Sequence, residues 1–227
     1  MILPRVGLQS GVGLQSGVGL QSGAGLQVDE PRLILASASQ SRRDLLEAAG
    51  LTFDVLPSQV DEAEIKLAAR AEGMSAADTA LTLADLKAGR VAGRAPQALV
   101  IGADQILVCD GAWFDKPADR DAARHQLLSL RGKAHVLATA VVCHHGGRRI
   151  WHHVVEPRLV MRTFSDTFLD TYLAAEGEMV TSTVGAYRLE CRGVHLFERI
   201  DGDHAAILGL PLLPLLSFLR QHGALAD

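Results

Sequence analysis

Short apolar runs alternate with helical periodicities along most of this chain. Leu33–Ala36 is an apolar run of strand length, and Arg42–Ala49 follows it with helical character and ends at Gly50. Asp110-Gly111 and Gly146-Gly147 are typical of tight hairpin turns. Further strands are predicted at 53–56, 99–109, 134–143, 150–163 and within 187–200, and further helices at 76–91, 119–130, 167–175 and up to residue 222. Because helices, strands and hairpins interleave, we expect an α/β fold with a mixed sheet.

The first 30 residues have a different character. The hexad VGLQSG occurs three times between Val6 and Gly23 and is followed by AGLQ. So few hexads cannot bury a continuous core. We therefore expect a flexible low-complexity tail over residues 1–30 and a single domain over residues 31–227. The tail lacks the basic start and unbroken apolar stretch of a secretory signal, so export is not predicted.

Composition excludes several classes of protein. With 48% hydrophobic and 21% charged residues in 227, the chain can bury a core and is neither fibrous nor disordered throughout. Its net charge of −4 argues against a nucleic-acid partner. Leu210–Leu219 is too short to cross a membrane. Three cysteines without a CxxC pair make a disulfide framework or a structural zinc site improbable, and a reducing cytoplasm is the expected location.

Asp104 is the most unusual residue of the predicted strands. It interrupts the apolar run from Leu99 to Cys109 together with Gln105. A carboxylate among strand hydrophobes is costly unless it is paired, bound to a metal or placed at the end of the strand. Two interpretations stay open at this point: a structural aspartate at a strand end or turn, or a functional general base or metal ligand.

The loop from Ser37 to Arg43 combines small hydroxyl residues, a helix start and two arginines. Backbone N–H groups and guanidinium groups in this arrangement are typical of a phosphate-binding loop. A serine that only caps a surface helix is the alternative, and no Walker motif is present in the chain. Lys87 and Lys116, two of only four lysines, would each pass for a surface residue when considered alone.

Taken together, seven stretches resemble the Maf family of nucleotide pyrophosphatases. The resemblance runs from about Leu33 to Gly223, and although each stretch alone is weak, seven in register are specific. The stretches are LILASASQSRRDLLEAAGLTF at 33–53, VDE at 60–62, LADLKA at 83–88, IGADQ at 101–105, DKP at 115–117, GAY at 185–187 and GLPL at 209–212. The resemblance implies an ITPase-like fold with two lobes around a central cleft, a homodimer, and hydrolysis of a nucleoside triphosphate to the monophosphate and pyrophosphate with a divalent cation, Mg²⁺ or Mn²⁺.

The resemblance also implies roles for single residues. It places Asp104 at the family's proton-acceptor position and, together with Glu62, at the expected metal site. The positions expected to be catalytic are Asp104, Glu62, Lys87 and Lys116, and those expected to bind substrate are Ser37, Ser39, Arg42 and Arg43. Water must attack the α-phosphorus while cations neutralise the triphosphate, which suits these residue types. Which of the two carboxylates binds metal and which activates water stays open.

Three positions differ between branches of the family and here are Ser41, Gln105 and Glu190. The pyrimidine-selective branch resembles Arg, Thr and Gln at these positions, and the branch acting on 7-methyl-GTP resembles Trp, Gln and Glu. Gln105 and Glu190 match the second branch, and a carboxylate at position 190 could accept from N1–H and N2–H₂ of guanine. Ser41 departs from both, since serine cannot stack on a cationic methylated base.

We therefore expect a purine-leaning pyrophosphatase, with 7-methyl-GTP as one candidate substrate. Two alternatives remain: a non-catalytic nucleotide-binding regulator of cell division and septum formation, and a phosphatase or nucleotide transferase that uses the same loop. The intact set of charged residues at 62, 87, 104 and 116 argues against the regulator, because a binding protein has no need of a base opposite the α-phosphate.

Overall fold

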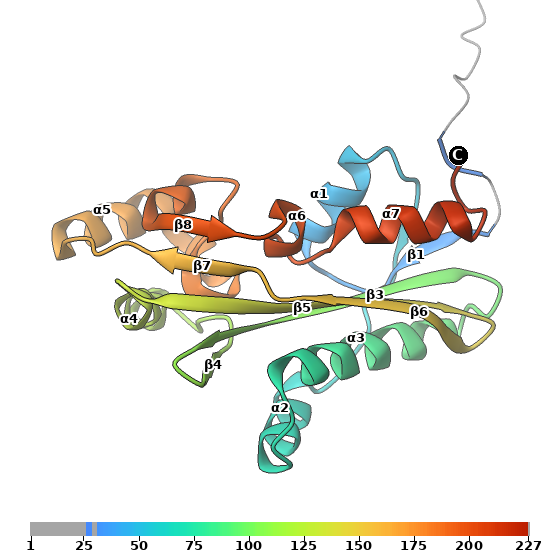
Figure 1. Ribbon diagram of the computed structural model, residues 1–227, viewed down its shortest axis with the longest axis horizontal. Helices are drawn as coiled ribbons and strands as arrows, with labels where there is room; N and C mark the ends of the chain where they lie inside the picture. The colour runs from blue at the N-terminus through green and yellow to red at the C-terminus, as the bar shows by residue number, and fades with distance from the viewer. Residues whose placement is uncertain (1–25, 29–30, 227) are drawn as a thin grey trace, which may run out of the picture.

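The fold is built on one mixed sheet of eight described strands (Figure 1). The structure, a computed structural model, describes residues 26–28 and 31–226, so most of the expected tail over 1–30 lies outside the described residues. The strands are β1 (Leu33–Leu35), β2 (Asp54–Val55), β3 (Leu99–Cys109), β4 (Ala112–Phe114), β5 (Ala134–His145), β6 (Arg148–Val155), β7 (Arg158–Met161) and β8 (Phe197–Asp201).

Helices cover both faces of this sheet. The α-helices are α1 (Gln40–Ala48), α2 (Glu62–Ala71), α3 (Ala76–Ala92), α4 (Arg120–Leu130), α5 (Asp166–Glu176), α6 (His204–Ile207) and α7 (Leu212–Gln221), and three 3₁₀ turns are η1 (Gly177–Thr181), η2 (Val184–Ala186) and η3 (Arg192–Leu196). In the described part of the chain, no helix combines the length and apolar character that a bilayer crossing needs.

The sheet order is β2-β1-β3-β5-β7-β8, with β4 paired to β3 and β6 paired to β5. β1 runs parallel to β2 and β3, whereas β3 and β5 are antiparallel over a long register from Val100 opposite His144 to Val108 opposite Val136. The prediction of an α/β fold with a mixed sheet is therefore confirmed.

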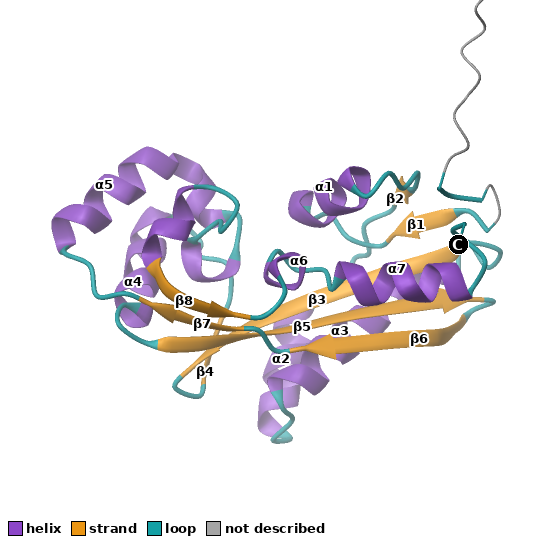
Figure 2. Ribbon diagram, turned by 45° about the horizontal axis from the view of Figure 1, so that its top comes forward, coloured by secondary structure: helices purple, strands orange, loops and turns teal. Residues whose placement is uncertain are grey.

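Side chains of successive strand residues enter different cores, as the two-residue period of a strand requires. Leu33 and Leu35 pack with α1 and α7 on one face, while Ile34 and Val100 pack with α3 on the other. A third core joins α4 and α5 to the far end of β3, where Leu107 is fully buried. Figure 2 shows this group apart from α1, α3 and α7, with β3 and β5 running through both parts. The molecule thus has the two lobes that the resemblance implies.

Two local predictions differ from the structure, and one helix has no counterpart among the predictions. The strand expected over 150–163 is two strands, β6 and β7, which break at Pro157, because proline has no N–H to donate to a ladder. Most of the β-rich stretch expected over 187–200 is irregular or 3₁₀, and only β8 is a strand. Helix α2 was not expected at all, since it buries little: Ala69 is buried, whereas Leu67 is 73% exposed.

Candidate active site

A cleft of about 760 Å³ opens between the two lobes. Its walls come from the loop before α1, from α2, α3 and β3, from the loop after β4, and from the segment that contains η1 and η2. The structure brings together ten of the residues expected from the sequence: Ser37, Ser39, Ser41, Arg42, Glu62, Lys87, Asp104, Gln105, Lys116 and Glu190. Arg43 does not line the cleft, so the structure gives no support to its expected contact with substrate.

Lys87 joins two carboxylates in the cleft. Its Nζ lies 2.5 Å from Oδ1 of Asp104 and 2.6 Å from Oε1 of Glu62. Asp104 sits in the middle of β3, opposite Ala140 of β5, and its side chain is only 4% exposed. The interpretation of Asp104 as a strand-end or turn aspartate is therefore wrong. A carboxylate this deep in a sheet is stable only because the buried ammonium of Lys87 pairs with it.

The second oxygen of Asp104 has no partner. Oδ2 is buried and receives no hydrogen bond from any described residue. Glu62, at the start of α2, is more open to the cleft, with a side chain 44% exposed. Burial alone would raise the pKa of Glu62, but nearby cations, above all Lys87, outweigh it, and the pKa lies below its ordinary value. Glu62 therefore stays ionised at a pH low enough to protonate a free carboxyl group.

These two carboxylates form a donor set that suits a hard divalent cation. Mg²⁺ is commonly held by one or two carboxylates and completes its shell with water and substrate phosphates. The described residues contain no cluster of three or more His, Cys, Asp or Glu side chains placed to hold a metal. The unpartnered Asp104 oxygen beside Glu62 fits this shared type of site, in which the protein supplies only part of the coordination.

Arg42 connects the loop before α1 to the GLPL turn. Its guanidinium donates through Nε to the carbonyl oxygen of Gly209 at 2.8 Å and through Nη1 to Ser37 Oγ at 2.9 Å. Burial lowers its pKa, while Asp104 and Glu62 raise it in part. Ser39 caps α1 by accepting from the backbone N–H of Arg42. The capping interpretation therefore holds for Ser39, and Arg42 fixes the shape of the loop as well as its charge.

Among the described cations that line the cleft, Lys116 is the one with neither an ion-pair partner nor a side-chain hydrogen bond. It follows β4 and is exposed. Its ammonium is partly desolvated by the walls of the cleft, which lowers the pKa; the charges of Arg42 and Lys87 lower it further, and Glu62 and Asp104 offset only part of this. An added anion in the cleft would relieve this repulsion, which makes Lys116 a natural contact for a phosphate.

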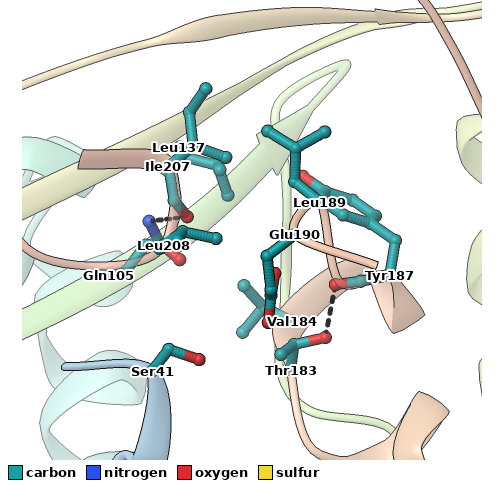
Figure 3. Close-up of a pocket in the computed structure, with 10 residues that line it drawn as sticks. All are labelled: Ser41, Gln105, Leu137, Thr183, Val184, Tyr187, Leu189, Glu190, Ile207 and Leu208. Atoms are coloured by element: carbon teal, nitrogen blue, oxygen red, sulfur yellow. Dashed lines mark hydrogen bonds between the residues drawn. The ribbon is translucent and has the colours of Figure 1, made fainter. Parts of the chain in front are cut away.

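A narrow pocket with mostly apolar walls adjoins the cleft and contains all three expected specificity residues (Figure 3). Figure 3 shows Gln105 and Ser41 on one side of it and Glu190 on the other. The Gln105 amide nitrogen donates to Thr139 Oγ1 at 2.8 Å and to the carbonyl oxygens of Ala206 and Ile207 at 3.1 Å. Its Oε1 therefore remains as an acceptor, so that both sides of the pocket present acceptor oxygens.

Sequence reasoning missed several residues of the cleft. Lys66 lines it and lies one helical turn after Glu62, a spacing that could have indicated a shared face. Arg188 also lines it, and its Nη2 lies 3.3 Å from Oε2 of Glu176, whose side chain is 1% exposed. The Arg188 contact had no sequence signal, because the buried acid stands twelve residues away.

Residues 32–222 match the family model described as Maf-like protein. The chain belongs to this family. It is similar to a nucleoside triphosphate pyrophosphatase of Granulibacter bethesdensis, with 58% identity over 194 residues that cover 86% of this chain and 98% of the relative. A protein of the same name from Paramagnetospirillum magneticum is 54% identical over 192 residues, or 85% of this chain and 99% of the relative. A 7-methyl-GTP pyrophosphatase of Rhizobium meliloti is 46% identical over 196 residues, with 86% and 98% covered.

Proposed function

We propose that this chain hydrolyses a nucleoside triphosphate to the nucleoside monophosphate and pyrophosphate. The observation that carries the proposal is the buried Asp104, held by Lys87 beside Glu62 in a cleft, with one carboxylate oxygen left unpartnered. Two similar Maf-like proteins carry the name nucleoside triphosphate pyrophosphatase. A regulator that only binds nucleotides has no use for a buried, oriented carboxylate, so that alternative is not favoured.

Asp104 is the proposed general base. A water molecule at its unpartnered oxygen gives up a proton to the carboxylate while the water oxygen bonds to the α-phosphorus. The bond between the α-phosphorus and the bridging oxygen breaks, and pyrophosphate leaves with the electron pair. Lys87 holds Asp104 in place, and Lys116 stabilises the negative charge that develops on the phosphates.

A divalent cation, Mg²⁺ or Mn²⁺, is part of the proposal. Because the unpartnered oxygen of Asp104 is the proposed acceptor of the water proton, Glu62 is the carboxylate that would hold the cation, and when bound the cation would neutralise phosphate charge. The lowered pKa of Glu62 keeps that carboxylate ionised and available as a ligand.

The pocket supports a preference for purines, guanine in particular. Glu190 lines the pocket with two carboxylate oxygens, and these could accept from N1–H and N2–H₂, which guanine offers as donors on one edge. A pyrimidine such as uracil offers a single ring N–H there, which would leave one acceptor unpaired at a cost. One similar protein is named a 7-methyl-GTP pyrophosphatase, which makes that nucleotide a substrate to test.

We further propose that the enzyme acts as a homodimer in the cytoplasm. The support is the resemblance to the family, together with three free cysteines of which Cys109 and Cys143 are buried. Light scattering coupled to gel filtration, with the full chain, measures the assembly directly, and a mass of one chain would contradict the dimer.

The function is tested with a panel of canonical and methylated nucleoside triphosphates and either Mg²⁺ or Mn²⁺, with both products quantified. We expect pyrophosphate release, and we expect Asp104→Asn to lower kcat by about 10²- to 10⁴-fold, the usual contribution of a general base. Asp110→Asn makes the same chemical change in the exposed β3–β4 turn and should leave kcat unaltered.

Three outcomes of this panel contradict the proposal. Release of orthophosphate would indicate a phosphatase. An undiminished kcat in Asp104→Asn would show that Asp104 is not the general base. No turnover of any nucleotide would favour the regulator. A Glu190→Gln variant with unchanged base preference would contradict only the argument for guanine.

A further inference from the structure

Lys66 is a largely buried cation of the cleft that the proposed mechanism does not use. It lies on α2 four residues after Glu62, and residues at this spacing share a helix face. The two nevertheless do not pair with each other. Glu62 contacts Lys87, whereas Lys66 Nζ lies 2.6 Å from Oδ1 of Asp115 in the loop after β4. One face of α2 is thus held to α3 at one point and to that loop at another.

The Lys66–Asp115 pair is uneven in its exposure to solvent. The Lys66 side chain is only 12% exposed, whereas that of Asp115 is 72% exposed. An ion pair with one partner so open to water contributes little to stability. Asp115 can therefore rotate into solvent at small cost, while the packed stem of Lys66 keeps its ammonium at the wall of the cleft.

Most other cations of the cleft already have protein partners. Lys87 contacts two carboxylates, and Arg42 and Arg188 are held by hydrogen bonds and ion pairs. Among the described residues that line the cleft, this leaves Lys116, and Lys66 once Asp115 has moved, to meet a multiply charged anion.

We infer that Lys66 binds the leaving phosphates of the substrate, and that Asp115 is the counter-ion which it exchanges for them. The inference rests on the proposed function for the identity of the substrate. Lys66 lies one turn along α2 from Glu62, which contacts the Lys87–Asp104 pair, and its partner Asp115 directly precedes Lys116. In the proposed reaction Asp104 faces the α-phosphate, so Lys66, one turn further along α2, is assigned to the pyrophosphate end of the triphosphate.

The test is direct binding, without turnover. Inorganic tripolyphosphate, pyrophosphate and a nucleoside monophosphate are titrated calorimetrically into the full chain, in buffer with EDTA, so that ammonium contacts and no metal contacts are measured. Lys66→Met should weaken the binding of both inorganic anions by about 10- to 100-fold, the effect of losing one charged hydrogen bond. Binding of the monophosphate should not change, and Lys66→Arg should retain most of the affinity for the inorganic anions.

Asp115→Asn should increase the affinity for the inorganic anions, because it removes the carboxylate that competes with them for Lys66. We expect tripolyphosphate to bind about two- to fivefold more tightly, in line with the small energy of an exposed ion pair. The matched control is Lys133→Met, since Lys133 Nζ lies 3.0 Å from Oδ2 of Asp110 and neither residue lines the cleft. That variant should bind all three ligands like the parent chain.

Folded Lys66→Met with unchanged affinity for tripolyphosphate would overturn the inference. If Lys66→Met does not fold, Asp115→Asn decides the question, and unchanged or weaker binding overturns it. The two proposals can fail separately. A parent chain that hydrolyses nucleotides while Lys66→Met binds normally refutes the role of Lys66 alone. If instead the parent chain hydrolyses no nucleotide, and Lys66→Met has a reduced affinity for the inorganic anions, the proposed reaction is refuted and the role of Lys66 is supported.

Discussion

Lys87 and Asp104 each depend on the other for a stable place in the protein. Their side chains are 10% and 4% exposed, and removing one partner of such a pair leaves an uncompensated buried charge. The third member, Glu62, is 44% exposed and faces the open part of the cleft. The Lys87–Asp104 pair is therefore held rigidly at the buried side of the cleft. Glu62 is more exposed and is the carboxylate best placed to contact a ligand that enters from solvent.

His135 shows how a single buried residue sets the response of the protein to acid. It is 2% exposed on β5, and its Nε2 lies 2.8 Å from the hydroxyl oxygen of Tyr187, which lines the narrow pocket beside the cleft. Burial lowers the pKa of His135 from 6.5 to about 4. Because the unfolded chain takes up the proton first, stability is fully present above pH 6.5 and falls as the pH decreases toward 4.

We predict that this residue accounts for up to about 3 kcal/mol of the loss in unfolding free energy between pH 7 and pH 4, at about 1.4 kcal/mol per pKa unit. His135→Gln retains a partner for Tyr187 but cannot titrate, so its stability should depend less on pH. Urea denaturation at several pH values measures the difference, with the exposed His125→Gln as control. Equal acid sensitivity in His135→Gln and the parent chain would refute the assignment.

Among single residues, the sequence allowed prediction of those that break a pattern. Asp104 could be found because a charge stands out in an apolar strand, and Ser39 because a hydroxyl precedes a helix. Lys66 and Arg188 could not, because each stands in an ordinary polar setting and gains its position from tertiary contacts with Asp115 and Glu176.

At the level of elements, the distance between α3 and β3 sets the geometry of the site. α3 carries Lys87 and β3 carries Asp104, and the two elements approach closely at Gly102. A Cβ at Gly102 would lie 2.8 Å from the Cβ of Ala88 and would overlap the carbonyl oxygen of Ala84. Glycine and the alanines of α3 thus permit the contact that brings the ammonium to the carboxylate.

Gly102→Ala should move α3 away from β3 and separate the pair. We expect destabilisation of about 1–3 kcal/mol, the usual cost of overpacking. We also expect kcat to fall by about a hundredfold, since a displacement near 1 Å has that effect on a catalytic arrangement.

Gly93→Ala, at the end of α3, is the matched control for this prediction. The atom nearest to its new Cβ would be 3.6 Å away and its backbone is helical, so we expect stabilisation of about 0.4–1 kcal/mol and an unchanged kcat. Urea denaturation and steady-state kinetics of both variants provide the measurement. A Gly102→Ala protein equal to the parent in stability and rate would show that this contact does not position the site.

Elements with a strong apolar period were predictable, and weakly patterned ones were not. The long strands β3 and β5 and the helix α3 bury nearly continuous apolar faces, and all three were expected. α2 buries one alanine and is held in place by the ion pairs of Glu62 and Lys66. Hydrophobic periodicity cannot predict such ion pairs.

For the whole molecule, the cleft combines segments that are distant in sequence. Its walls come from residues 36–66, 87–116 and 179–209. Hydrophobic periodicity places a residue on an element but does not place elements against one another, so the residues alone predicted separate motifs. The resemblance to a family is what predicted their assembly, and the arrangement of Asp104, Glu62, Lys87 and Lys116 in one cleft agrees with it.

The N-terminal boundary of the folded domain can be tested on the same scale. Contacts with the domain extend back to Leu26–Val28, before the expected start at residue 31. Gln27 pairs with Leu225 in an isolated bridge, and its side chain bonds to the backbone of Thr52 at 2.8 and 2.6 Å. The family match begins at residue 32, and the repeats are too few to form a core of their own.

We predict that deletion of residues 1–25 leaves the melting temperature and kcat/KM unchanged, because the family match begins at residue 32 and so few hexads cannot bury a core of their own. Deletion of residues 1–31 should instead lower the unfolding free energy by about 1–2 kcal/mol, since it removes several hydrogen bonds and each contributes about 1 kcal/mol net. Calorimetry and kinetics on the two truncated chains separate these cases. If deletion of residues 1–25 lowers the melting temperature, the hexad repeats contribute to the fold. The folded domain would then include these residues as well.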